Sequence, residues 1–459
     1  MAITIERHVD SIRSEDTYQR AYGRAVKHLI GQVEESGYMR ASAIWRAYDP
    51  HWFRDSSIVA IALFTAYNDL KREDPELALK ALAAGKRITS FNIRAIENFI
   101  PNIQRGLELC VQNQDYFKNK YHIPTKVGRD LGYYRGTLGS RDFERIYDDE
   151  QMEYNTGLRQ NDSVPLVMLS IVNEARFSPL ERSKGRALSN IIKIGLEYVG
   201  TNYPLESADA WEMEHGLIHS YNVAAADVAF QSARFFARNG IVKISEGEIS
   251  AFERLNRDCP DGPIEFLKKY FIKEGVIYRS KVPFGRIVME NGVDGTLAHM
   301  LTLFEISDKV IGLSGVERKT MEVVERDLFG GRADKEKPNV LPLRVSFEAY
   351  NYFGDGRWLP VGLSFAVYYL NNGEVEKAKS IIDHVVNQWE ERTGVYSKGL
   401  PEQELIDVMN PKEDHGGYLN ANDGKPIEDL AWSYAGLILA ISRYEEVKRG
   451  EPLIQILRT

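Results

Sequence analysis

The segment HWFRDSSIVAIALFTAY (residues 51–67) joins a charged pair, Arg54 and Asp55, to a run of small apolar residues. From Ser56 to Tyr67 a helix would be apolar on nearly every side, and such a helix must be surrounded by protein. The charged pair stands immediately before this run. The segment therefore predicts a buried helix with a charged pair at its N-terminal entrance.

Five further segments are apolar on nearly every side of a helix. They are SVPLVMLSIV (163–172), NVAAADVAFQSARFFA (222–237), GTLAHMLTLFEI (295–306), VGLSFAVYYL (361–370) and LAWSYAGLILAI (430–441). Other segments have one apolar stripe and one charged face, which is typical of helices packed on one side only. Examples are residues 17–36, 178–199, 315–329 and 374–392.

Six buried helices, each preceded by amphipathic helical sequence, can be packed in one simple arrangement. The buried set forms an inner ring, and the amphipathic set forms an outer ring that shields it. We therefore predict an all-α fold, a single (α/α)6 barrel of six inner and six outer helices over residues 1–459. Two stacked helical bundles or an irregular α-solenoid are the alternatives. No change in composition and no low-complexity linker divides the chain.

Composition and charge argue against several classes of function. The net charge of -8 gives no basic surface for nucleic acid or for an anionic membrane. No run reaches the about 18 apolar residues of a membrane helix. The N-terminus lacks the apolar stretch of about 7–15 residues in a secretory signal, so we expect a cytoplasmic protein. Cys110, Cys259 and the nine histidines form no metal-ligand pattern, so we predict no metal site and no cofactor.

Polar residues gather before each of the buried helices. In chain order the preceding segments are WFRD, RQND, WEMEHG, ENGVDG, YFGDGRW and KPIEDL. Because all inner helices of an alternating barrel run in the same direction, these segments would meet at one mouth. Carboxylates, Arg, amides and indoles suit sugar hydroxyls and sugar rings. Taken singly, the acids could be helix caps or first-turn acids and the indoles could be core residues. The acids in question are Asp55, Asp162 and Asp429, and the indoles are those of Trp52, Trp211, Trp358 and Trp432.

Two further acids are suited to acid–base catalysis. Glu212 lies beside Trp211, an apolar neighbour that would raise a carboxyl pKa by desolvation and keep the group protonated. Glu402 follows a turn marked by Gly399 and Pro401, so it is predicted to lie on a loop. Glycoside hydrolysis requires one carboxylic acid to protonate the leaving oxygen and one carboxylate to activate water. Glu212 could be the acid and Glu402 the base.

From about residue 45 to residue 445 the chain resembles the glucoamylase family, glycoside hydrolase family 15. HWFRDSSI is similar to the family's W-x-R-D segment, RQNDSVP to its Q-x-D segment and AWEMEHG to its W-E-x-x-x-G segment. LPEQ resembles the segment that carries the general base, and EDLAWSYAGLILA is close to the D-L-T-W-S-Y-A helix. YFGDGRW is similar to a segment that ends in a Trp at the mouth. The resemblance implies an (α/α)6 barrel.

The resemblance also implies a role for each matched residue. Arg54 and Asp55 would hold the hydroxyl groups of the terminal glucose. Glu212 would be the general acid and Glu402 the general base. The other residues expected to bind substrate are Trp52, Gln160, Asp162, Trp211, Glu214 and Trp358.

The sequence departs from the family pattern in two respects. The fungal members have a second Glu directly after the acid, whereas here Met213 follows and Glu214 comes next. The resemblance therefore leaves the contacts beyond the first sugar open. The Arg-Asp motif arrives already at residue 54, so we expect neither the N-terminal β-sandwich of many prokaryotic relatives nor a starch-binding module. A soluble oligosaccharide is then a better expectation than raw starch.

The function predicted from these features is an inverting, exo-acting glucosidase that releases glucose from soluble α-glucans or oligosaccharides. An α,α-trehalase of the same family is an alternative, because the two share the first glucose site. A non-catalytic carbohydrate-sensing or regulatory protein is an alternative from another class, against which the presence of both Glu212 and Glu402 argues. An isomerase or lyase on this barrel would typically use a histidine base, and we expect His215 and His219 to pack or cap instead. Linkage preference and oligomeric state are not predicted.

Overall fold

A computed structural model describes most of the 459-residue chain. The described residues are 2–42, 50–113, 126–127, 129, 161–205, 207, 217–256, 260–281, 292–293, 295–329, 340–342, 356–390, 400, 403–405, 429–452 and 457. In this part of the chain, no helix combines the length and the apolar character needed to cross a membrane.

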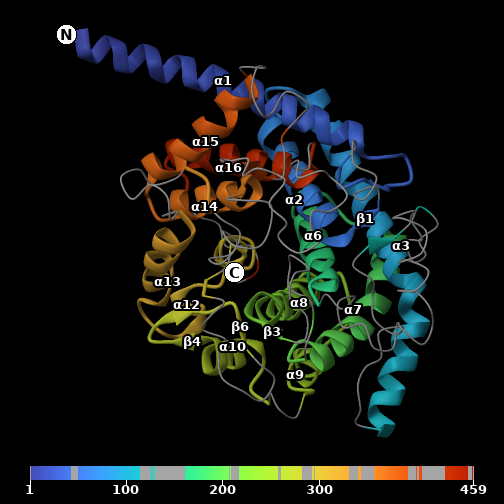
Figure 1. Cartoon of the computed structure of the whole chain (residues 1–459). Coiled ribbons are helices and arrows are strands. Elements are labelled where there is room, and N and C mark those ends of the chain that lie inside the picture. Colours follow the sequence, from blue (N-terminus) through green and yellow to red (C-terminus); the bar gives the residue numbers. More distant parts are fainter. Residues whose placement is uncertain are drawn as a thin grey trace, which may run out of the picture.

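Six buried helices among the described residues form a closed inner ring (Figure 1). They are α2 (Phe53–Leu70), α6 (Ser163–Phe177), α8 (Ser220–Arg238), α11 (Leu297–Thr302), α14 (Leu359–Asn371) and α16 (Ala431–Lys448). Each helix packs against the next along the chain, and α16 packs against α2. The last contact closes the ring and confirms the predicted inner ring of an all-α barrel.

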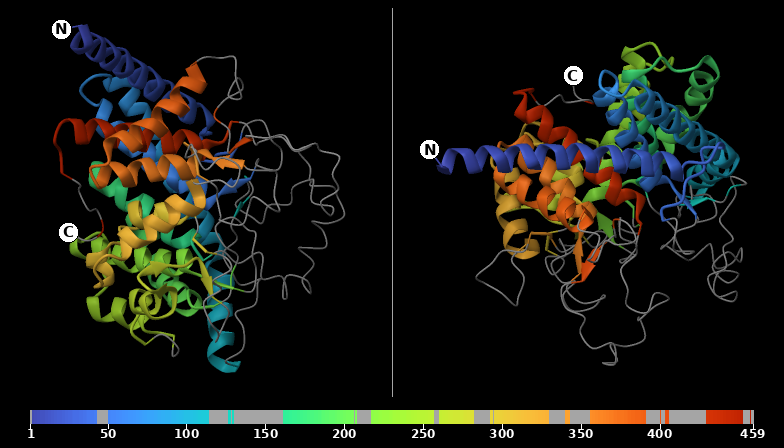
Figure 2. Two further views of the ribbon diagram at one scale, coloured as in Figure 1. Left: turned by 60° about the vertical axis from the view of Figure 1, so that its left-hand side comes forward. Right: turned by 90° about the horizontal axis from the view of Figure 1, so that it is seen from above.

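A second set of helices covers the ring from outside and alternates with the inner helices along the chain (Figure 1). The set comprises α1 (Ala2–Gln32), α3 (Pro75–Asn113), α7 (Arg182–Asn202), α9 (Glu246–Glu253), α10 (Pro263–Phe271), α12 (Asp308–Ile311), α13 (Val316–Val324) with the π-helix η5 (Glu325–Phe329), and α15 (Val375–Glu390). The first turns of α1 project beyond the rest of the molecule (Figure 2). The alternation of inner and outer helices is that of an (α/α)6 barrel.

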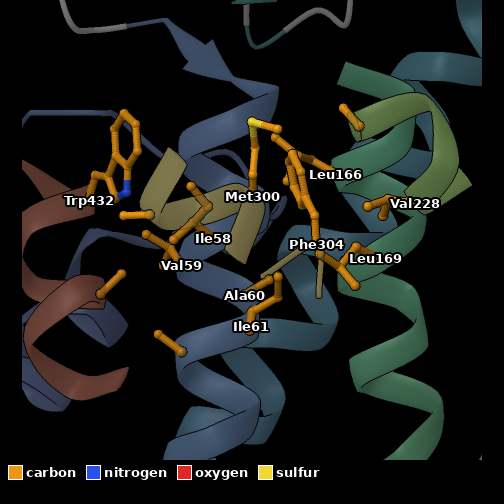
Figure 3. Close-up of a cluster of buried hydrophobic side chains, with 14 of the residues drawn as sticks. Ile58, Val59, Ala60, Ile61, Leu166, Leu169, Val228, Met300, Phe304 and Trp432 are labelled. Carbon is orange, nitrogen blue, oxygen red and sulfur yellow. The ribbon is translucent and has the colours of Figure 1, made fainter. Parts of the chain in front are cut away.

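Apolar side chains fill the centre of the inner ring. Figure 3 shows a cluster of such side chains, among them Ile58 and Ile61 of α2, Leu169 of α6, Val228 of α8 and Phe304, which follows α11. All of these side chains are buried. Full burial of one such side chain stabilises a protein by about 1.5–3 kcal/mol, so this centre holds the ring together.

Short strand pairs lead into three of the inner helices. β1 (His51–Trp52) pairs with β2 (Lys126–Val127) before α2, β3 (Ile218–His219) with β6 (Ser280–Lys281) before α8, and β7 (Gly356–Trp358) with β8 (Gln403–Leu405) before α14. All are antiparallel, as is the hairpin of β4 (Ile272–Lys273) and β5 (Val276–Ile277) in the outer ring. Leu430, the residue before α16, forms an isolated bridge with Ser42. The entrances of these inner helices are therefore fixed by backbone pairing.

One inner helix is shorter than the sequence predicts. The apolar run 295–306 reads as a single buried helix, but α11 ends at Thr302. Glu305 follows with a φ of 53°, in the left-handed region that ends a helix. Its carboxylate accepts a hydrogen bond from the backbone N–H of Leu457 at 3.2 Å. A contact with the far end of the chain thus favours a turn that the local sequence does not reveal.

Candidate active site

Side chains near the starts of all six inner helices form one continuous series of contacts. In order, the members are Ser364 of α14, His299 of α11, Trp432 of α16, Arg54 of α2, Asp162 at the start of α6 and Tyr221 of α8. Because each member belongs to the first or second turn of its helix, the N-terminal ends of the inner helices lie together. The single mouth predicted from the sequence is present.

Arg54 is at the centre of this series. Its Nη1 lies 3.4 Å from Oδ2 of Asp162, and its Nε lies 4.0 Å from Oδ2 of Asp55. Its guanidinium carbon lies 5.6 Å from the centre of the Trp432 ring. Arg54 is only 7% exposed, and a buried charge needs partners of opposite sign. The Arg-Asp pair of the opening segment is therefore part of a buried charge cluster rather than a surface ion pair.

Asp162 occupies the N-cap position of α6, but its side chain caps no backbone group of the described residues. The carboxylate turns instead towards Arg54, and Tyr221 lies near enough to interact with it electrostatically. Burial raises the pKa of Asp162 above its ordinary value, and the charge of Arg54 offsets part of that rise. Its Oδ1 atom accepts no hydrogen bond of ordinary length from the described residues. Asp162 thus belongs to the buried charge cluster and does not cap its helix.

The backbone adds positive potential to the mouth. Within the described residues, none of the six inner helices has a side-chain hydrogen bond from its N-cap residue to the first turn. The N–H groups of a first turn carry partial positive charge. Six such ends at one place favour negative charge and attract the oxygen atoms of a polar ligand.

Three indoles stand at helix entrances. Trp52 is half-buried and precedes α2, and Trp358 is buried and precedes α14, where its backbone N–H donates to Pro342 O at 2.9 Å. Trp432 is buried in the first turn of α16, and its ring lies 5.2 Å from that of His299. Of the three, Trp432 brings apolar surface against the charged cluster, because the Arg54 guanidinium lies over its ring.

A buried histidine anchors the strand that leads into α2. The backbone N–H of Met39 donates to His51 Nδ1 at 3.0 Å, so the ring proton lies on Nε2, which donates to Asn92 Oδ1 at 2.6 Å. Burial lowers the pKa of His51 to about 4, which keeps the ring neutral near pH 7. His51 therefore fixes the entry of the chain into the Arg54 turn.

Solved structures with similar folds are glycosidases. A wild-type glycosidase superimposes with a TM-score of 0.69 at 15% sequence identity, covering 94% of this chain and 98% of the other. A glucoamylase from Hormoconis resinae gives a TM-score of 0.57 at 14% identity, covering 96% of this chain and 76% of the other. A family 15 glucoamylase from Hypocrea jecorina gives 0.59 at 14% identity, covering 94% and 72%.

The chain has a glucoamylase-like fold. This confirms the fold that the sequence motifs implied. No protein-family profile and no curated protein matches the sequence. At these levels of identity the likeness concerns the fold.

Within this glucoamylase-like fold, five of the predicted site residues lie outside the described residues. They are Gln160, Trp211, Glu212, Glu214 and Glu402. The described residues on either side of 208–216 meet, because Ser207 and Leu217 form a β-bridge. The Ser207 hydroxyl also accepts a hydrogen bond from Asn222 Nδ2 of α8 at 2.7 Å. Glu212 thus belongs to a segment whose two described flanks stand at the entrance of α8.

The described neighbours of Glu402 also stand at the mouth. On one side, the backbone N–H of Leu400 donates to the Tyr434 hydroxyl oxygen at 3.0 Å, and Leu400 O accepts from the backbone N–H of Leu430. On the other side, Gln403 pairs with Trp358 across β7 and β8. The two flanks therefore join the entrances of α16 and α14.

Some residues at the mouth cannot be predicted from the sequence. Tyr221, His299 and Ser364 lie within or beside apolar runs, and the only sequence signal is a lone polar residue in such a run. His219 is expected to pack or cap; it is buried, its Nδ1 lies 3.0 Å from Ser280 Oγ, and it makes no side-chain cap hydrogen bond, so it packs. Asp429 accepts a hydrogen bond from Tyr434 and lies 2.9 Å from His28 of α1. It therefore links α1 to α16.

No group of three or more His, Cys, Asp or Glu side chains in the described residues is arranged to hold a metal ion.

Proposed function

We propose that this protein is an inverting, exo-acting glucosidase that releases glucose from the ends of soluble α-glucans or oligosaccharides. The observation that carries the proposal is the series of buried polar contacts through the entrances of all six inner helices, on a glucoamylase-like fold. Charged, hydrogen-bonding groups beside an indole suit a neutral, polyhydroxylated ligand. One of the glycosidases of similar fold holds glucose.

The residues of the mouth divide between binding and chemistry. Arg54 and Asp55 hold the terminal glucose. Glu212 protonates the glycosidic oxygen, and Glu402 removes a proton from the attacking water, which arrives from the opposite face of the sugar. Inversion requires the two carboxyl groups to stand roughly 6.5–9.5 Å apart, to leave room for that water. The described flanks of both acids at the mouth support these roles.

A substrate panel tests the reaction. Trehalose, maltose, isomaltose and maltotriose are incubated with the full chain, and NMR follows the anomer of the released glucose. We expect β-glucose from at least one maltose-type substrate. Cleavage of trehalose alone would instead identify a trehalase. With maltotriose, whose leaving group is maltose, initial release of α-glucose from the non-reducing end would contradict inversion. Absence of hydrolysis throughout the panel would favour a carbohydrate-sensing protein.

Two variants test the catalytic roles. Replacing either acid, Glu212→Gln or Glu402→Gln, is expected to lower turnover by about 10²–10⁴-fold, the usual contribution of a general acid or base. Sugar binding should persist, because the amide keeps the size of the carboxyl group. Glu76→Gln, on the exposed surface of α3, is the matched control and should leave turnover unchanged. Full activity in either site variant would assign its role to another residue.

A further inference from the structure

His299 of α11 is 2% exposed, and its hydrogen bonds fix the position of the ring proton. Nε2 of His299 lies 3.0 Å from the hydroxyl oxygen of Ser364, and that hydroxyl donates its proton to Pro360 O at 2.9 Å. A serine hydroxyl has one proton, so it must accept from His299. The ring proton is therefore on Nε2, and Nδ1 carries a lone pair.

Nδ1 of His299 is a buried acceptor that no described residue satisfies. Leaving such an atom without a donor is costly, so native structures usually provide a partner, water or ligand. Burial and the nearby charge of Arg54 lower the pKa of His299 to about 3. The ring stays neutral near pH 7, so Nδ1 remains an acceptor.

The surroundings of His299 place it at the mouth. Its ring lies 5.2 Å from the ring of Trp432, which also lies 5.6 Å from the guanidinium of Arg54. The next residue, Met300, points into the apolar centre of the ring (Figure 3). His299 therefore stands between that centre and the charged cluster, where Asp162 provides a second buried acceptor without a described partner.

We propose that Nδ1 of His299 accepts a hydrogen bond from one hydroxyl group of the sugar bound at the mouth, so that His299 is a specificity-determining residue. The proposal rests on the proposed function, because it takes a sugar as the ligand, but it concerns binding and not hydrolysis. A site that hydrogen-bonds a hydroxyl group discriminates strongly against an analogue that lacks it. The neutral ring selects a hydroxyl donor without adding charge beside Arg54.

Binding of glucose and its monodeoxy derivatives to the full chain tests the proposal by calorimetry. We expect the derivative that lacks the recognised hydroxyl to bind the wild-type chain roughly 3- to 10-fold more weakly than glucose. His299→Gln keeps a donor for Ser364 and removes the Nδ1 acceptor. It should weaken glucose binding by a similar factor and bind that one derivative no worse than the wild type does.

Two further variants sharpen the test. In His299→Asn the amide oxygen can take the place of Nδ1, so glucose binding should recover in part. His384→Gln, on the outer helix α15, is the control and should bind every sugar as the wild type does. If His299→Gln fails to fold, Ser364→Ala supplies the test, because it keeps the ring and removes the acceptor that fixes its proton. Weaker glucose binding is then expected.

The outcomes separate the two proposals. If the wild-type chain binds glucose and both His299→Gln and Ser364→Ala bind all the sugars equally well, His299 does not contact the ligand and the inference is wrong. If the wild-type chain binds no sugar of the series and hydrolyses no α-glucoside, the proposed function fails and the inference fails with it.

Discussion

At the scale of the residue, Arg54 provides the positive charge that pairs with the buried carboxylate of Asp162 at the mouth. Arg54→Ala would leave the buried carboxylate of Asp162 without its opposite charge, and breaking a buried pair in this way costs about 3–5 kcal/mol. We expect a lower free energy of unfolding and weak sugar binding. Chemical denaturation and calorimetry measure the two effects.

Two further variants distinguish the effect of the charge of Arg54 from the effect of its planar geometry. Arg54→Lys keeps the charge but loses the planar fork, so it should fold well and bind sugar poorly. Adding Asp162→Asn to Arg54→Ala removes the uncompensated charge and should restore part of the stability. If Arg54→Ala were as stable as the wild type, the buried pair would have no structural role.

The buried ring of His51 makes the free energy of unfolding depend on pH. Its pKa falls from an ordinary 6.5 to about 4 in the folded chain. Between these values the unfolded chain binds a proton that the folded chain does not, so stability falls as pH falls from 6.5 to 4. The loss is about 1.4 kcal/mol per pH unit, or roughly 3 kcal/mol over the window. Below pH 4 both states are protonated and no further loss follows from this residue.

Urea unfolding between pH 3.5 and 7.5 measures the effect of His51. His51→Gln cannot titrate, so its stability should fall less steeply over the same window. The difference between the two profiles isolates His51, because His299 and the carboxylates titrate in both proteins. Parallel profiles would show that His51 is not buried in its neutral form.

The sequence predicts the position of a polar residue at the mouth well where that residue stands at the edge of a strong pattern. Arg54, Asp55 and Asp162 come just before runs that can only be buried helices, so the end of the helix fixes their place. His299 and Tyr221 cannot be assigned in this way, because their roles depend on the rotation of each helix and on partners far apart in the chain. Glu212 and Glu402 remain predictions.

At the scale of the element, close helix packing depends on particular glycines. A Cβ atom at Gly200 of α7 would lie 2.1 Å from the backbone oxygen of Phe252 in α9. Because a backbone atom cannot swing aside, Gly200→Ala must separate the two helices, and overpacking of this kind costs about 1–3 kcal/mol. Thermal unfolding should show a lower midpoint.

Gly185 is the matched control on the same helix. A Cβ atom there meets nothing within 4 Å. Gly185→Ala should therefore stabilise the protein by about 0.5–1 kcal/mol through helix propensity alone. If both variants shifted the midpoint in the same direction, packing against Phe252 would not be the reason for glycine at position 200.

The elements themselves follow from the sequence to different degrees. Helical periodicity predicts α2, α6, α8, α14 and α16, since each is apolar all round and long enough to be distinctive. The turn at Glu305, just after α11, coincides with a contact to Leu457, which no local pattern contains.

At the scale of the whole molecule, the number and the alternation of the two kinds of helix predict the fold. Six all-apolar helices that alternate with amphipathic ones leave few ways to bury every apolar face, and the closed ring is the one observed. The alternatives of stacked bundles and a solenoid would leave α2 and α16 unpaired at opposite ends of the chain. Their packing against each other excludes both.

The closed ring predicts cooperative unfolding of a single domain. Because α16 packs on α2 and α1 packs on α16, neither end of the chain can melt without exposing the inner ring. Differential scanning calorimetry should therefore show one transition. A ligand bound to the folded chain at 100 times its dissociation constant adds about 2.7 kcal/mol, so saturating glucose should raise the midpoint without splitting the peak. Two separate transitions, or a shift of only part of the peak, would show that the chain contains independent domains and that the mouth belongs to one of them.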